Sequence, residues 1–296
     1  MHGPVFTQLL GAMIQHLQHL NDQGSGALRV SSSTLAALTR PRSNSGFASK
    51  SEFIAKKSLE EEPQSFPCPD LSMRSSPPTL LSVAGLDSDS KHSAFQQLQI
   101  RALECKKCPH LASSRRNVVF GAGSLESEIL FVGEAPGAEE DAIGQPFVGK
   151  AGELLTKIIQ AMGLSRETVF IANVLKCRPD TPGKSSGNRK PSPVEMGTCL
   201  PYLEEQIAII RPKVMVALGS TAIEGLLRRT PVQVTRIRGQ WFDFRGIPLM
   251  PTYHPAYLLR NDSITEKRKV WEDMLAVMEK LQLPITQKQQ NFFLKP

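Results

Sequence analysis

Apolar and polar residues alternate in blocks along the second part of the chain, beginning near residue 93. Four short apolar runs each end in a loop of glycine or polar residues: Ile129–Val132, Val169–Ala172, Val214–Leu218 and Leu249–Tyr253. Runs of this length, bounded by such loops, predict buried strands. Apolar positions at helical spacing separate them and predict helices over Ala94–Glu104, Gly152–Met162, Pro193–Ile210, Thr221–Arg228 and Thr265–Leu281.

Strands that alternate with helices predict a parallel sheet of βαβ units, with helices on both faces because the crossovers are right-handed. We therefore expect a three-layer α/β/α sandwich around a central, mainly parallel sheet of four strands. Ligands of such open sheets bind beyond the carboxyl ends of the strands. Glu134, Asn173, Ser220 and His254 each follow one of the four apolar runs. Their placement predicts a site at that edge of the sheet.

The first ninety or so residues have a different composition. Apolar residues at helical spacing predict a short amphipathic helix within residues 1–22. Residues 23–92 are rich in Ser, Pro and Gly and predict a linker without a fixed fold. The acid-free stretch 23–51 also resembles an organelle transit segment, although disorder is the preferred interpretation. The folded domain is expected over residues 93–285, with a tail over residues 286–296.

The formal net charge of +7 belongs entirely to the second part of the chain, because residues 1–92 hold 8 basic and 8 acidic residues and the remainder holds 27 and 20. A basic folded domain favours nucleic acid as a partner, with ordinary solubility charge as the alternative. No apolar run reaches the roughly 18 residues that a membrane helix needs. The start of the chain lacks the cationic segment of a secretory signal. We expect a monomer in the cytoplasm, a reducing compartment, with no membrane partner.

Four cysteines flank the predicted site along the chain. Cys105 and Cys108 form a C-x-x-C pair, Cys177 and Cys199 follow far downstream, and Cys68 stands alone in the linker. Four thiolates suit an iron–sulfur cluster, and they also suit tetrahedral zinc. The spacing does not separate these two alternatives, but the C-x-x-C pair disfavours four unrelated thiols.

Taken together, these segments resemble the family-four uracil-DNA glycosylases, the iron–sulfur members of that superfamily. The matching segments are Gly133-Glu134-Ala135-Pro136-Gly137, Gly144-x-Pro146-Phe147-Val148-Gly149-x-Ala151-Gly152, Asn173-Val174-x-Lys176-Cys177-Arg178-Pro179, Asn188-Arg189 and His254-Pro255-x-x-Leu258-Leu259-Arg260. Each is weak evidence alone, whereas the ordered set at strand ends is highly specific. The resemblance covers roughly residues 95–285 and leaves the first part of the chain unexplained.

The resemblance implies a structural [4Fe–4S] cluster, with zinc as the alternative. Its ligands would be Cys105, Cys108, Cys177 and Cys199. The segment Asp180–Gly187 makes the interval between Cys177 and Cys199 longer than is usual in the family. Cys199 is therefore the ligand that most needs a structural check.

Two residues match catalytic positions of the family. Glu134 would orient the attacking water and stabilise an oxocarbenium-like sugar, whereas family-five enzymes lack a polar side chain there. His254 would donate a hydrogen bond to uracil O2, which gains negative charge as the base departs. The alternatives are a glutamate that caps the following helix and a structural histidine.

Four further residues match positions around the base. Phe147 would stack on the uracil ring, and Gly133 would lie beside it. The amide of Asn173 would accept from uracil N3–H and donate to O4, a pattern that cytosine does not match. Glu140 would line the C5 edge, where bulk excludes the methyl group of thymine. Without the resemblance, Phe147 would be assigned to the core and Asn173 to a turn.

The remaining matches concern the DNA strand. Leu258, or with less support Tyr257, would fill the space left by the extruded nucleotide. Arg260, Arg189 and the helix N-terminus at Ser220 are candidates for phosphate contacts, with exposed surface charge as an equally good interpretation.

The sequence thus predicts a monofunctional DNA repair glycosylase that hydrolyses the N-glycosidic bond of uracil in single- or double-stranded DNA and leaves an abasic site. No lysine stands at a catalytic motif position, so lyase chemistry through a Schiff base is not expected. One alternative is a glycosylase for hypoxanthine or other deaminated bases. A non-catalytic, cluster-bearing DNA-binding protein is a second, against which Glu134 and His254 argue. A zinc-stabilised α/β domain without a nucleic-acid role is a third, against which the basic charge argues.

Overall fold

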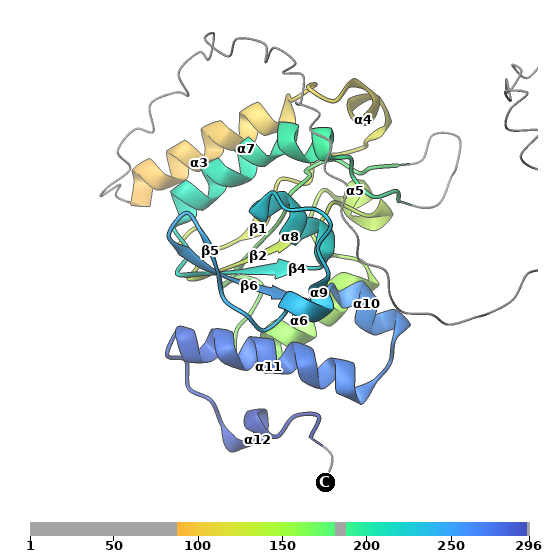
Figure 1. Ribbon diagram of the computed structural model, residues 1–296. Coiled ribbons are helices and arrows are strands. Elements are labelled where there is room, and N and C mark those ends of the chain that lie inside the picture. Colours follow the sequence, from red (N-terminus) through yellow and green to blue (C-terminus); the bar gives the residue numbers. More distant parts are fainter. Residues whose placement is uncertain (1–87, 181–187, 295–296) are drawn as a thin grey trace, which may run out of the picture. The chain divides into compact units, whose positions relative to one another are not determined.

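The computed structural model of the 296-residue chain describes residues 88–180 and 188–294 (Figure 1). The predicted helix within residues 1–22 and nearly all of the predicted linker lie outside these ranges. Contacts divide the chain into two units, 1–72 and 73–296, and every described residue belongs to the second.

A six-stranded sheet with the order β1-β3-β2-β4-β6-β5 forms the centre of this unit. The inner four strands are parallel to one another: β2 (Ile129–Gly133), β3 (Phe170–Asn173), β4 (Val214–Leu218) and β6 (Ile247–Thr252). β1 (Ala122–Gly123) and β5 (Phe242–Phe244) pair antiparallel at the two edges. The predicted fold class is confirmed, and the four predicted strands are the parallel ones. The prediction of four strands in total was wrong, because edge strands of two and three residues are too short to show a period.

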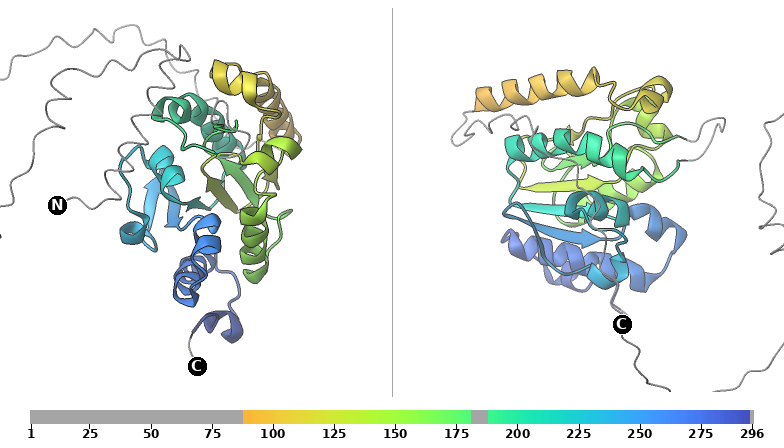
Figure 2. Two further views of the ribbon diagram at one scale, coloured as in Figure 1. Left: turned by 90° about the vertical axis from the view of Figure 1, so that its right-hand side faces the viewer. Right: turned by 45° about the horizontal axis from the view of Figure 1, so that its top comes forward.

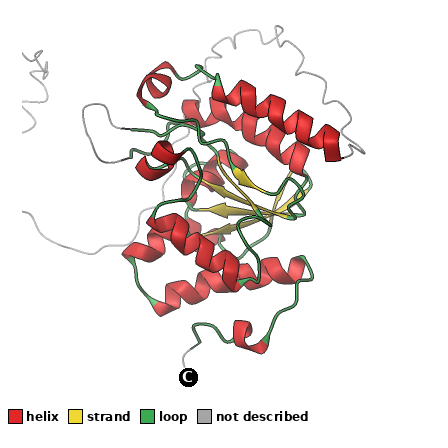
Figure 3. Cartoon of the chain, turned by 180° about the vertical axis from the view of Figure 1, so that it is seen from behind, coloured by secondary structure: helices red, strands yellow, loops and turns green. Residues whose placement is uncertain are grey.

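Helices cover both faces of the sheet (Figures 1 and 2). α3 (Ser88–Leu103), α7 (Pro193–Ile210) and α8 (Ser220–Leu227) lie on one side. α6 (Lys150–Ala161) and α11 (Ile264–Lys280) lie on the other. Figure 3 shows the same layers from behind. The shorter helices are α4 (Pro109–Ser114), α5 (Ala138–Ile143), α9 (Val234–Ile237), α10 (Pro255–Arg260) and α12 (Gln287–Gln290).

Each inner strand contributes to two separate cores, because successive side chains point to opposite faces of a sheet. In β2, Leu130 and Val132 pack with α7 and α8, whereas Ile129 and Phe131 pack with α6 and α11. All five residues of β2 are buried. Burial on both faces explains why these strands read as continuous apolar runs in the sequence.

Pro251 lies in an inner strand without breaking it. Its carbonyl accepts a hydrogen bond from Gly239 N (3.4 Å), on the side of β6 where β5 has already ended at Phe242, the partner of Leu249. The amide hydrogen that proline lacks would point to that same side, so no ladder hydrogen bond is lost.

Residues just outside both ends of the predicted domain, 93–285, take part in the fold. Helix α3 begins at Ser88, inside the predicted linker. The predicted C-terminal tail contacts α11, since Trp271 Nε1 donates to the carbonyl of Gln289 (2.5 Å) and the rings of Trp271 and Phe292 lie 5.2 Å apart. Among residues 88–180 and 188–294, no helix has the length and apolar character needed to cross a bilayer.

Candidate active site and cysteine cluster

The register of the sheet brings the four predicted strand-end residues to one edge. Gly133 of β2 lies opposite Asn173 of β3, and Leu218 of β4 lies opposite Thr252 of β6. Glu134, Ser220 and His254 follow within two residues of these positions. Parallel strands end at the same edge, so the placement follows directly from the apolar runs.

Gly133 lies close to both Phe147 and Asn173 at this edge. A methyl group built on Gly133 would lie 2.4 Å from Asn173 Oδ1 and 2.5 Å from Phe147 Cζ, so a side chain there would displace both. The Phe147 ring also stacks on the imidazole of His254, with centroids 5.6 Å apart and planes at 30°. The structure therefore brings three of the four predicted base-binding residues together with His254, the predicted hydrogen-bond donor to uracil O2.

Asn173 carries an acceptor without a partner. Its side chain is 2% exposed, and Oδ1 is the buried side-chain atom that lacks any hydrogen bond among the described residues. Leaving a buried polar atom unpaired costs about 1–3 kcal/mol. A ligand that donates a hydrogen bond at this point would remove that cost.

His254 is held as a neutral imidazole with a defined tautomer. It precedes α10 as the N-cap residue, and its Nδ1 accepts from Ala256 N (3.1 Å). An Nδ1 that accepts a hydrogen bond carries no proton, so the ring hydrogen is assigned to Nε2. Burial, together with the nearby positive charge of Arg260, lowers the pKa of His254 from 6.5 to about 4. The ring is therefore a neutral donor at neutral pH.

Glu134 and Glu140 differ in the hydrogen bonds that their carboxylates accept. Glu134 is half-buried at the end of β2, and within the described ranges its carboxylate accepts no hydrogen bond. Glu140 caps helix α5 and accepts from Gly137 N, Val148 N and Gly149 N, each at 3.0 Å. The alternative that Glu134 caps α5 is therefore wrong, because Glu140 has that role. The structure shows Glu140 bracing the loop that carries Phe147, and its predicted contact with the C5 edge of the base stays a prediction.

Leu258 does not occupy the position predicted for it. Its side chain is 3% exposed and packs with Tyr253 and Val270 beneath α10. A wedge that enters DNA must project from the surface, and the next residue, Leu259, is 49% exposed. Of the two neighbouring leucines only Leu259 is exposed on α10, because burial within a six-residue helix depends on how that helix docks.

The three predicted phosphate contacts differ in availability. Arg260 is exposed at the end of α10, and Ser220 begins α8. Arg189, by contrast, forms a bidentate ion pair with Glu195 (2.5 and 2.8 Å), a residue that is 3% exposed. This ion pair fixes the loop before α7, and it lowers the pKa of Glu195 far below its usual range. The guanidinium of Arg189 is thus used in a structural ion pair within the protein.

The four predicted cysteine ligands gather in one cluster of packed side chains. Cys177 and Cys199 are buried in it, and the half-buried Cys105 and Cys108 pack against them. Asp180 and Asn188 pair at the base of the long loop, so the extra residues do not separate Cys177 from Cys199. Ala135, which follows Glu134, packs on the same cluster.

Hydrogen-bond donors point at two of these sulfur atoms. Arg115 Nη1 donates to Cys177 Sγ (3.1 Å) while its Nη2 donates to the carbonyl of Cys105 (2.7 Å), and Lys176 N donates to Cys199 Sγ (3.3 Å). Burial raises the pKa of Cys108 and Cys177, and it raises that of Cys199 to about 12. Thiols in such a site bind a proton tightly unless a cation replaces it. In the described residues, no three His, Cys, Asp or Glu side chains are arranged to hold a single metal ion.

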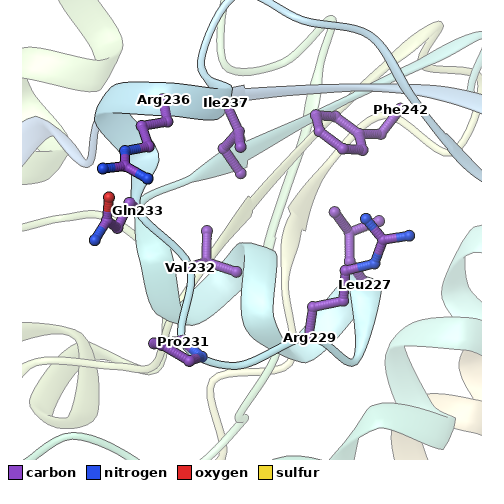
Figure 4. A pocket seen from close by; sticks show the side chains of 8 residues that line it. All are labelled: Leu227, Arg229, Pro231, Val232, Gln233, Arg236, Ile237 and Phe242. Atoms are coloured by element: carbon purple, nitrogen blue, oxygen red, sulfur yellow. The ribbon is translucent and has the colours of Figure 1, made fainter. Parts of the chain in front are cut away.

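A cavity of about 350 Å³ lies apart from these residues, between the end of α8, α9 and β5 (Figure 4). It is lined by Leu227, Arg229, Pro231, Val232, Gln233, Arg236, Ile237 and Phe242. None of the predicted site residues contributes to this lining, so the cavity does not belong to the candidate active site.

The parallel sheet with a polar site at its carboxyl edge agrees with the comparison to known families. Residues 120–275 match the family model of the uracil DNA glycosylase superfamily, and the chain belongs to this superfamily. The type-4 uracil-DNA glycosylase of Thermotoga maritima is 47% identical over 175 residues, which cover 59% of this chain and 88% of that protein. The type-4 enzyme of Sulfurisphaera tokodaii is 41% identical over 188 residues, covering 61% and 81%. A type-5 enzyme of Pyrobaculum aerophilum is 26% identical over 189 residues, covering 53% and 80%.

Proposed function

We propose that the protein removes uracil from DNA by hydrolysis of the N-glycosidic bond, the first step of base excision repair. The unpaired Oδ1 of Asn173 carries this proposal, since uracil N3–H is the donor that it lacks. In the same orientation the amide N–H would donate to uracil O4. Cytosine has no hydrogen at N3 and has an amino group at C4, so it would face acceptor with acceptor and donor with donor.

Phe147 and Gly133 shape the surface on which the extruded base rests. The ring of Phe147 supplies a flat apolar face, and the missing side chain of Gly133 lets the base approach Asn173. Enzymes that act on a base in DNA must extrude it from the stack, at a cost of a few kcal/mol. Leu259, which is exposed on α10, would fill the space that the base leaves.

His254 and Glu134 divide the chemistry between the base and the sugar. The Nε2–H of a neutral His254 would donate to uracil O2, and this hydrogen bond strengthens as negative charge develops on the departing base. The carboxylate of Glu134 is free of competing hydrogen bonds within the described residues. It can therefore orient a water molecule toward the sugar carbon and stabilise the positive charge there.

The donor set of the cysteine cluster fits a [4Fe–4S] group held by Cys105, Cys108, Cys177 and Cys199. All four thiols lie in one packed cluster, and N–H donors reach two of the sulfurs, as is common around iron–sulfur sites. Zinc would need four sulfurs about 2.3 Å from one ion, and the described residues show no three His, Cys, Asp or Glu side chains arranged around a single ion. The cysteine cluster links α3, the segment after β3 and α7. A group bound there would fix these segments beside the loop that carries Glu134.

The decisive experiment measures base excision from matched oligonucleotides. Single- and double-stranded substrates carrying one uracil, hypoxanthine or thymine are incubated with the full chain, and abasic sites are cleaved with alkali and counted. Release of uracil without thymine supports the proposal. Faster release of hypoxanthine would favour the broader glycosylase, and tight binding without release would favour a DNA-binding protein.

A further inference from the structure

Phe147 has a backbone conformation that a non-glycine residue rarely adopts. Its φ of +53° lies in the left-handed region, which costs about 1–3 kcal/mol unless surrounding groups enforce it. The consequence is functional, because this conformation sends the Phe147 ring toward Gly133 and His254. Some part of the chain must therefore hold the backbone in place.

Arg166 supplies two hydrogen bonds at this point. Its Nη2 donates to the carbonyl of Pro146 (2.6 Å), and its Nη1 donates to the carbonyl of Phe147 (2.9 Å) and reaches Thr156 Oγ1 (3.3 Å). Arg166 is half-buried in the turn between α6 and β3, and within the described residues it forms no ion pair. Both ends of its planar guanidinium are thus used on the main chain of the Phe147 loop.

Helix α6 encloses the same carbonyl from the other side. A methyl group built on Gly152 would lie 1.8 Å from Phe147 O, so the helix packs directly against this atom. Thr156, one turn further along α6, donates to the carbonyl of Gly152 (2.9 Å) while it accepts from Arg166. The guanidinium therefore ties the loop to the helix as well as to the turn before β3.

We propose that Arg166 is a positioning residue for base recognition: it clamps the Pro146 and Phe147 carbonyls and so holds the Phe147 ring where the uracil stacks. This inference rests on the proposed function, since it concerns the same base site. Arg166 itself does not contact the base in this proposal. Its loss should act wholly through Phe147.

The test is a double-mutant cycle with Arg166→Gln, Phe147→Ala and the combined variant. Single-turnover uracil excision and inhibition by free uracil are measured for each, because free uracil reports on the base site without DNA. We expect Arg166→Gln to lower excision about 10- to 100-fold and to weaken uracil inhibition, since small misplacements of binding groups have effects of this size. The combined variant should be no worse than Phe147→Ala alone, because both changes remove the same contact.

Three controls separate a positioning role from a structural one. Arg166→Lys, which can reach one carbonyl but lacks the fork, should recover part of the activity, and it carries the test if the Gln variant fails to fold. Binding to abasic DNA should stay unchanged. Arg245→Gln, which removes an exposed arginine paired with Glu204, should leave every measurement unchanged.

Two outcomes would overturn the inference while the proposed function stands. One is an active wild-type enzyme whose uracil inhibition is unaltered by Arg166→Gln. The other is a double-mutant cycle in which the free-energy losses of Arg166→Gln and Phe147→Ala add up in the combined variant. A wild-type protein that releases no uracil would instead refute the proposed function.

Discussion

At the scale of single residues, Asn173 should decide which base is accepted. Asn173→Asp keeps the size of the side chain but replaces the N–H donor with a carboxylate oxygen, which would face uracil O4. We expect uracil excision to fall at least about 100-fold, because an unmatched buried polar group costs about 1–3 kcal/mol and a charged one costs more. Binding to abasic DNA should change little. Excision at the wild-type rate would remove Asn173 from the base site.

His254 should remain neutral through the range in which an exposed histidine titrates. Its pKa of about 4 predicts an imidazole NMR titration with a midpoint near pH 4. Between pH 6.5 and 4 the unfolded chain binds a proton at this residue and the folded chain does not. The free energy of unfolding should therefore decrease as the pH is lowered from 6.5 to 4. His254→Gln should reduce this dependence of stability on pH. A midpoint near 6.5 would contradict the assignment of His254 as a neutral donor.

The residues that the sequence could and could not predict differ in one physical respect. Glu134, Asn173 and His254 follow apolar runs, so their meeting at one edge depends on strand order and register alone. The roles of Glu140 and Arg166 depend on loop conformation, because their partners are main-chain atoms up to 20 residues away. Neither hydrophobic periodicity nor a sequence motif indicates such hydrogen bonds.

At the scale of elements, α10 shows how a motif can mark a helix without showing which face is outward. Leu258 and Leu259 are neighbours in the sequence, yet Leu258 packs with Val270 while Leu259 is exposed. Most of the long elements were predictable to within a few residues, and α7 and β4 have the predicted bounds, whereas α3 begins at Ser88 and not at the predicted Ala94. Short elements such as β5 and α9 were missed, because they form through contacts with β6 and not through their own pattern.

Substitution of these two leucines should therefore have different effects. Leu259→Ala should lower excision from double-stranded DNA more than from single strands, because a wedge matters where a partner strand must be separated, and it should leave the melting temperature unchanged. Leu258→Ala should instead destabilise the fold by about 2–5 kcal/mol, the range for a buried leucine. Thermal unfolding and paired excision assays check both. A stable Leu258→Ala variant with a duplex-specific defect would restore the original assignment.

At the scale of the whole molecule, the cysteine cluster joins segments that are far apart in the chain. It lies where α3, the loop after β3 and α7 meet, and its packing extends to Ala135 beside Glu134. Protonated thiols at these four positions would contribute little to holding such segments together. A bound cation would replace the protons and crosslink the segments, so metal loading and the geometry of the catalytic loop should be coupled.

Loss of one ligand should therefore affect stability before chemistry. Protein purified without oxygen should be brown and contain four iron atoms and four sulfides per chain, as a [4Fe–4S] group requires. Cys199→Ala should lower the iron content and the melting temperature together, and its excision activity should fall at temperatures where the wild type is still folded. Cys68→Ala, outside the described residues, is the matched control and should keep its colour and stability. A colourless wild-type protein with one zinc ion per chain would replace the iron–sulfur assignment, whereas full iron content in Cys199→Ala would remove Cys199 from the ligand set.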